Sequence, residues 1–228
     1  ADLFARDYIA TYVERDLRLL QNVGDLSVFR RFLELCAGRA GQLLNLSALA
    51  ADAGISVNTT KAWLSLLEVS WLVMRLPPWH ENLTRRIVKS PKLYWFDTSL
   101  LCLLLGIRKP EDLRFHPLRG AVFENLIVAE RYKAASHRGL VPALNFWRDS
   151  NGREVDLIDG SGDEKRLWEC KSGATIAHEF FKQLDGFGAE IGIPPERRIL
   201  VYGGSETSKR SAGSAIGWKN VLLGSLDS

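Results

Sequence analysis

The spacing of apolar residues changes near the middle of the chain, and this change limits the possible folds more than any other feature. Residues 8–20 and 27–36 carry apolar side chains at helical intervals. After one long helical pattern at 118–135, the spacing becomes that of strands, interrupted by a further helical pattern at 178–191. The expected strands cover residues 143–148, 154–159, 166–171 and 198–202. The second half is therefore predicted to follow the order αβββαβ.

Two domains follow from this change of pattern. The chain has 228 residues, a length that suits two domains of about 100 residues each. Residues 108–117 are polar and contain two prolines, so we place the boundary there. We expect a helical domain at 1–115 and an α/β domain at 116–228, which makes the chain an α+β protein. We expect the tail from Ser205 to be loosely ordered, apart from residues 218–223.

The first domain carries the pattern of a winged helix. Residues 48–53, with Ser47 as the expected N-cap, and a second helix capped by Ser56 are separated by a short turn containing Gly54. Two extended segments, 71–76 and 87–96, follow and predict a two-stranded ribbon. Basic residues on this ribbon and on the second helix would contact nucleic-acid phosphates without reading sequence. These candidates are Lys61, Arg85, Arg86, Lys89 and Lys92. Alternatively, the same module mediates contacts with proteins or self-association.

Acidic residues of the second domain are expected to gather on one face of the sheet. Strict alternation puts Val155 and Leu157 on the core face and Asp156 on the opposite face. On the next strand the same argument places Glu169 and Lys171 together. Asp156 and Glu169 then lie directly opposite each other if the intervening loop has an even number of residues or a bulge corrects the register.

Such a cluster favours a divalent cation, because neighbouring carboxylates raise each other's pKa. Mg²⁺ or Mn²⁺ with oxygen ligands would relieve this repulsion, and Lys171 would then orient or deprotonate a water. Glu124 lies in the most apolar part of the long helix, so it is expected to be partly buried and to need a partner. Glu154 is interpreted as a solvated strand residue.

A helix with Glu, a strand with Asp and a following strand with Glu-x-Lys resemble the PD-(D/E)XK nuclease fold, also called restriction-endonuclease-like. The core of that family is αβββαβ. The resemblance implies phosphodiester hydrolysis with Mg²⁺, with metal ligands from Asp156, Glu169 and the carbonyl of Cys170. It assigns catalytic roles to Glu124, Asp156, Glu169 and Lys171, and an assisting role to Gln183.

Nearly the whole chain also resembles the C-terminal part of a family of prokaryotic AAA-type ATPases. The matching segments are residues 8–16, 88–98, 120–125, 153–156 and 169–171. The resemblance implies an ATPase module upstream, so that ATP acts only through that module. The nearest approach to a P-loop in this chain, residues 203–210, has Ser208 where a glycine is required and is interpreted as unrelated to phosphate binding. A DNA-associated nuclease module and a non-catalytic regulatory or protein-interaction module both remain open.

Charge and cysteine content add only broad limits. The net charge is +3 and the isoelectric point about 8.8, which permits DNA as a partner without requiring it. Three widely spaced cysteines predict neither a disulfide framework nor a zinc site, as is usual in the cytoplasm. No apolar run approaches the about 18 residues that a membrane span needs. The chain does not begin with Met, so we expect it to be a fragment of a longer protein.

Overall fold

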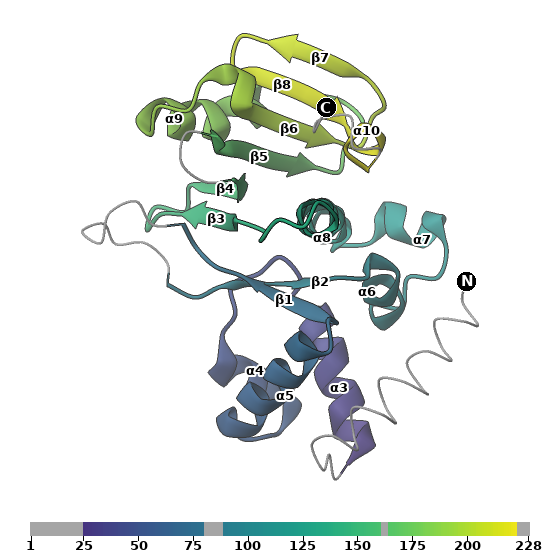
Figure 1. Cartoon of the computed structure of the whole chain (residues 1–228). Coiled ribbons are helices and arrows are strands. Elements are labelled where there is room, and N and C mark those ends of the chain that lie inside the picture. The colour runs from purple at the N-terminus through teal and green to yellow at the C-terminus, as the bar shows by residue number, and fades with distance from the viewer. Residues whose placement is uncertain (1–24, 80–88, 161–163, 223–228) are drawn as a thin grey trace. The chain divides into compact units, whose positions relative to one another are not determined.

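The computed structural model describes residues 25–79, 89–160 and 164–222. It is a mixed α+β protein in which helices precede a mixed sheet (Figure 1). The chain divides into two compact units: residues 1–75 with 92–122 form a helical unit, and residues 76–91 with 123–228 form an α/β unit. The helix expected at residues 8–20 and the candidate contacts Arg85 and Arg86 lie outside the described residues.

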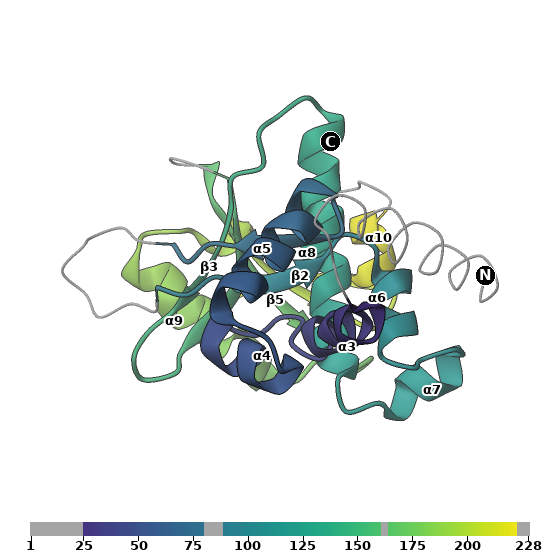
Figure 2. The ribbon, with the colours of Figure 1, turned by 90° about the horizontal axis from the view of Figure 1, so that it is seen from below.

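The helical unit contains five of the described helices, α3 to α7, and a two-stranded sheet. Its helices α3, α4 and α5 lie close together (Figure 2), and strand β1 pairs with β2. The bounds are α3 (Leu26–Ala37), α4 (Leu46–Ala53), α5 (Val57–Val69), β1 (Val73–Leu76), β2 (Lys92–Trp95) and α6 (Thr98–Leu104). A further short helix, α7 (Pro110–Phe115), follows α6.

Side-chain caps fix the ends of α4 and α5. Ser56 accepts the backbone N–H of Thr59 at 3.0 Å, as the sequence predicts. The predicted cap of α4 is wrong by two residues, because Asn45 accepts the backbone N–H of Ala48 and the helix starts earlier. Gly54 ends α4 with a φ of 72°, a conformation that glycine adopts without steric cost. The turn between the two helices is therefore specified locally.

Aromatic side chains fill the core of the helical unit. Phe29 and Phe32 of α3 are fully buried, and both meet the ring of Trp63 of α5 edge-on, with centroids 5.1 and 5.3 Å apart. Edge-to-face packing of this kind adds about 0.5–1.5 kcal/mol per pair beyond the burial of apolar area. Trp63 is thus a core residue of the helical unit.

The α/β unit is built on a six-stranded mixed sheet in the order β3-β4-β5-β6-β8-β7. Strands β3, β4 and β5 form an antiparallel meander, whereas β5, β6 and β8 are parallel and β7 is antiparallel to β8. Helix α8 (Arg119–His137) precedes the sheet, and α9 (Lys182–Glu190) connects β5 to β6. The strands are β3 (Leu144–Arg148), β4 (Glu154–Asp159), β5 (Arg166–Lys171), β6 (Arg198–Tyr202), β7 (Thr207–Arg210) and β8 (Gly213–Gly217).

Two segments are more ordered than the sequence predicts. The expected linker contains α7, which begins at Pro110, a residue whose fixed φ suits the first helical position. The expected loose tail contains the β7–β8 hairpin, followed by α10 (Trp218–Leu222). The P-loop-like segment, residues 203–210, ends in strand β7 and is followed by strand β8, not by a helix.

The segment after β1 belongs to the α/β unit, although the sequence assigns it to the helical domain. The carbonyl of Pro77 accepts the N–H of Phe146 at 3.1 Å, and the N–H of Trp79 donates to the carbonyl of Phe146 at 2.6 Å. These bonds satisfy backbone groups on the outer edge of β3, which would otherwise remain unpaired.

None of the helices in the described ranges is both long and apolar enough to cross a membrane. The three cysteines, Cys36, Cys102 and Cys170, are free thiols.

Candidate functional site

The antiparallel pairing of β4 and β5 brings two predicted site residues to the same point of the sheet. Ile158 pairs with Leu167, and Leu157 pairs with Trp168. The next residues along the two strands are Asp156 and Glu169. The six residues 160–165 between the strands satisfy the even-number condition. Asp156 also contacts the residue after Glu169: its carboxylate accepts the backbone N–H of Cys170 at 2.8 Å.

A register shift between β3 and β4 falls at the same place. Asn145 pairs with Ile158, whereas Trp147 pairs with Val155. Two steps along β3 therefore match three steps along β4, so β4 carries one extra residue. Asp156 is one of the two β4 residues in this bulge. Bulges of this kind occur often beside active sites, where they change the direction of a side chain.

The bulge overturns the predicted alternation. Val155 and Leu157 were expected on one core face, but Val155 and Ile158, three residues apart, share the core that packs against α9. Because the extra residue lies between them, the carboxylate of Asp156 does not enter that core. It lies instead beside a carboxylate of α8.

Helix α8 supplies that carboxylate. Glu124, Glu154 and Asp156 each place one carboxylate oxygen within 4.8 Å of the others. Glu124 is half-buried, as its apolar surroundings predict, and Asp156 is buried. Glu154 was interpreted as a solvated residue, but it is half-buried and also lies 3.2 Å from a guanidinium nitrogen of Arg148. The signal that could have identified Glu154 is its i, i+2 spacing from Asp156 on one strand.

Glu169 and Lys171 form a close ion pair next to this acidic triad. The Nζ of Lys171 donates to Oε1 of Glu169 at 2.5 Å. The other oxygen, Oε2, is buried and has no hydrogen-bond partner among the described residues. Burial raises the pKa of Glu169, Lys171 opposes this rise, and Glu124 and Glu154 add to it. The pair is therefore within electrostatic reach of the triad.

The same buried, acidic environment also shifts the pKa values of Lys171 and Cys170. Burial lowers the pKa of Lys171, but the adjacent carboxylate of Glu169 outweighs this effect, and the pKa is raised. Burial and the nearby carboxylates, with Asp156 foremost among them, raise the pKa of the Cys170 thiol well above its usual value. The Cys170 thiol is thus neutral at physiological pH.

The donor set suits a hard divalent cation. Oxygens on opposite sides of one Mg²⁺ lie about 4.2 Å apart, because each Mg–O distance is about 2.1 Å. The triad oxygens, within 4.8 Å of one another, approach this arrangement with a small side-chain adjustment. The unpartnered Oε2 of Glu169 is a further acceptor that an ion or its water would satisfy. Glu124, Glu154 and Asp156 are the residues that could hold the ion.

The remaining predicted site residues lie around this centre. The peptide of Cys170 is adjacent to Asp156 through its N–H, and the metal-ligand role of its carbonyl stays a prediction. Gln183 lies in the first turn of α9 and is half-buried. Its assisting role also stays a prediction.

The candidate phosphate contacts of the helical unit differ in exposure. Lys61 on α5 and Lys89 before β2 are exposed. Lys92 lies within β2 and is only 2% exposed. A buried ammonium does not reach a phosphate at the surface, so Lys92 no longer belongs to the candidate contacts.

Each half of the chain matches a family of unknown function. Residues 1–111 match the model "Domain of unknown function (DUF8612)", and residues 119–221 match "Domain of unknown function (DUF4143)". Domains of the second family are commonly found with AAA ATPases. No solved structure matches the chain.

Two curated mycobacterial proteins are similar to most of the chain. They are "Uncharacterized protein Mb2031c" of Mycobacterium bovis and "Uncharacterized protein Rv2008c" of Mycobacterium tuberculosis. Each is 34% identical over 151 residues, which is 66% of this chain and 33% of the relative. The match therefore spans about a third of the length of these relatives.

Proposed function

We propose that the chain is a DNA-associated module of an AAA-type ATPase, and that its α/β unit is a PD-(D/E)XK-like nuclease that hydrolyses phosphodiester bonds with Mg²⁺ or Mn²⁺. In this proposal the helical unit is a winged helix that contacts DNA phosphates through residues such as Lys61 and Lys89. The free thiols support a reducing, cytoplasmic setting.

One observation carries the proposal. Four carboxylates from α8, β4 and β5 and one lysine meet at a bulge in the sheet, and the carboxylate oxygen Oε2 of Glu169 is buried without a hydrogen-bond partner among the described residues. A purely structural sheet gains nothing from gathering like charges at a buried position, because each carboxylate destabilises the ionised form of the others. A cation and a phosphate ligand make this arrangement favourable.

The residues of the chain have distinct roles in the proposed reaction. Glu124, Glu154 and Asp156 would hold the ion, which would supply Lewis-acid polarisation of the scissile phosphodiester. The N–H of Cys170 orients the carboxylate of Asp156. Lys171, fixed by Glu169, offers a positive charge that positions the attacking water and stabilises negative charge on the phosphoryl oxygens.

A second candidate function is a regulatory or protein-interaction module that keeps the nuclease fold without cutting. The observation that favours it is the internal pairing of the site: Glu154 is paired with Arg148, and Glu169 with Lys171. These two cations partly neutralise the cluster without any metal. Such a module would transmit the state of the ATPase or bind a protein partner.

The experiment that separates the two functions combines metal binding and cleavage. The wild-type chain, Asp156→Asn and Lys171→Ala are incubated with linear and plasmid DNA in Mg²⁺ or Mn²⁺, and metal binding is measured by calorimetry. We expect cleavage by the wild type alone. Asp156→Asn should also lose metal binding, whereas Lys171→Ala should retain it because Lys171 is not a ligand.

Glu179→Gln is the matched control, since Glu179 is an exposed carboxylate of the same unit. This variant should cut and bind metal as the wild type does. If the wild type neither binds metal nor cuts DNA, the nuclease proposal is wrong and the regulatory module is favoured.

A further inference from the structure

A second polar site lies at the other end of β4. A pocket of about 550 Å³ opens between α8, the end of β4, the start of β5 and the residue before β6. Asp159 at this pocket is three residues beyond Asp156, or about 10 Å along a strand. Arg131 of α8, which also lines it, is seven residues beyond Glu124, or about 10.5 Å along a helix. The pocket is therefore about 10 Å from the acidic triad, measured along two elements.

Arginine dominates the charge of this pocket. Among the described residues that line it there are four arginines and two carboxylates, Asp159 and Glu164, so these residues carry an excess of two positive charges. Arg131 is only 4% exposed and donates to Asp159 from Nε at 2.8 Å, while its guanidinium lies over the ring of Trp168 at 4.8 Å. This buried pair forms a fixed wall of the pocket. The other three arginines are Arg138, Arg166 and Arg197.

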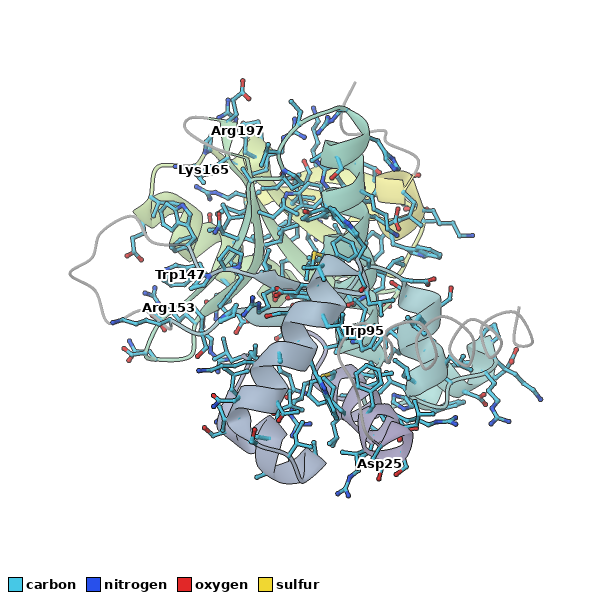
Figure 3. The ribbon with its side chains drawn as sticks, turned by 60° about the horizontal axis from the view of Figure 1, so that its bottom comes forward. Asp25, Trp95, Trp147, Arg153, Lys165 and Arg197 are labelled. Carbon is cyan, nitrogen blue, oxygen red and sulfur yellow. The ribbon has the colours of Figure 1, made fainter. Side chains whose placement is uncertain are left out.

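Arg197 is the residue that points to a ligand. It is half-buried, and its guanidinium has no hydrogen-bond or ion-pair partner among the described residues. Arg197 and Lys165 precede the neighbouring parallel strands β6 and β5, and both lie at the pocket end of the sheet, away from Arg153 (Figure 3). A partly desolvated guanidinium without a partner favours binding of an anion, and its planar donors match phosphate oxygens.

The pocket mouth also offers apolar surface. Leu140 is 56% exposed and Val141 is 92% exposed, and both line the pocket. A ligand that fits both features carries a phosphate together with a sugar or base that packs against the apolar rim. A nucleotide has this chemistry.

We propose that this arginine pocket holds a backbone phosphate of the DNA strand that extends to the acidic triad; the extension to the triad rests on the proposed nuclease function. In duplex DNA the phosphates of one strand advance about 3.4 Å along the helix axis per step, so a separation of about 10 Å along the axis corresponds to about three base-pair steps. The pocket thus anchors the strand while the triad lies at the scissile bond. Its role is to position the strand and not to cut it.

The test measures binding and not cleavage, so that it is independent of the nuclease activity. A fluorescent single-stranded hexadeoxynucleotide is titrated with the full chain in EDTA at several salt concentrations. Arg197→Gln should weaken binding at least about fivefold, because a hydrogen bond to a charged group is lost. The slope of log K against log salt should fall by about 0.7, the value for one phosphate contact on a single strand.

Arg210→Gln is the control, because Arg210 is an exposed arginine on β7 of the same unit. It should change neither the affinity nor the slope. The proposal is overturned if Arg197→Gln binds like the wild type, if both variants weaken binding equally, or if the wild type does not bind the oligonucleotide. A mononucleotide that binds as tightly as the hexamer would also overturn it, since the pocket would then be a small-ligand site. If the wild-type chain binds the oligonucleotide through Arg197 but cuts no DNA, only the nuclease proposal is contradicted.

Discussion

Asp156 has its position because β4 contains one residue more than its partner strand requires. A regular strand would direct the side chains of Val155 and Leu157 to the same face, and the bulge breaks this alternation. The carboxylate of Asp156 then reaches both Glu124 and the N–H of Cys170. At the scale of single residues, the site therefore depends on an irregularity of the backbone as much as on residue type.

Arg131 provides a prediction at the same scale. Arg131→Leu should destabilise the protein by about 3 kcal/mol, because it leaves the carboxylate of Asp159, 14% exposed, without its buried partner. The measurement is the free energy of unfolding in urea.

Lys133→Met is the matched change on the same helix. The pair of Lys133 with Glu130 is 2.7 Å long but about one-third exposed on both sides, so its loss should cost no more than about 0.5 kcal/mol. Equal destabilisation by the two variants would contradict the distinction between buried and exposed ion pairs in α8.

Strand β8 shows how an element depends on close backbone approach. Gly213 opens this strand with a φ of 155°, and an added Cβ would lie 2.4 Å from the carbonyl oxygen of Arg198. Gly213→Ala should therefore destabilise the protein by more than about 1 kcal/mol, because the backbone of β6 or β8 must move. Thermal or urea unfolding measures the change.

The control for this prediction is another glycine of the same unit. Gly186 lies within α9, and an added Cβ there meets no atom within 4 Å. Gly186→Ala should stabilise the protein by about 0.5–1 kcal/mol, since alanine loses less backbone entropy in a helix. If Gly213→Ala is also stabilising, the tight contact between β6 and β8 is not present in solution.

At the scale of the whole molecule, metal binding should be coupled to folding. An ion that binds only the folded site stabilises it by about 2.7 kcal/mol at 100 times its Kd, which corresponds to about 10 °C in the melting temperature of a unit of about 100 residues. We expect Mn²⁺ to produce such a shift for the wild-type chain relative to EDTA, in calorimetry of thermal unfolding.

Asp156→Asn should abolish this shift, because one of the three carboxylates proposed to hold the ion is lost. Glu179→Gln, which changes an exposed carboxylate, should preserve it. An equal shift in all three proteins would mean that Mn²⁺ binds elsewhere. The proposed assignment of the metal site to the triad would then be wrong.

Local pattern was sufficient to predict several elements. The bounds of β4, β5 and β6 agree with the predicted segments 154–159, 166–171 and 198–202, because buried strands combine β-branched or aromatic residues with clear turn signals. Ser56 was also identified correctly as a helix cap. By contrast, α7 and the β7–β8 hairpin were missed, since these segments are too short to show a periodicity and β8 takes its place in the sheet by pairing with β6.

The sequence by itself determined the order of helices and strands and placed Glu124, Asp156, Glu169 and Lys171 in one domain, because periodicity and turn residues act over short distances along the chain. Only the tertiary structure decided that Glu154 joins the acidic triad, that Lys92 is buried, and that arginines from α8, from β5 and from the position before β6 line one pocket. The reason is physical: burial and charge clustering depend on strand register and helix packing, which a one-residue bulge is enough to change.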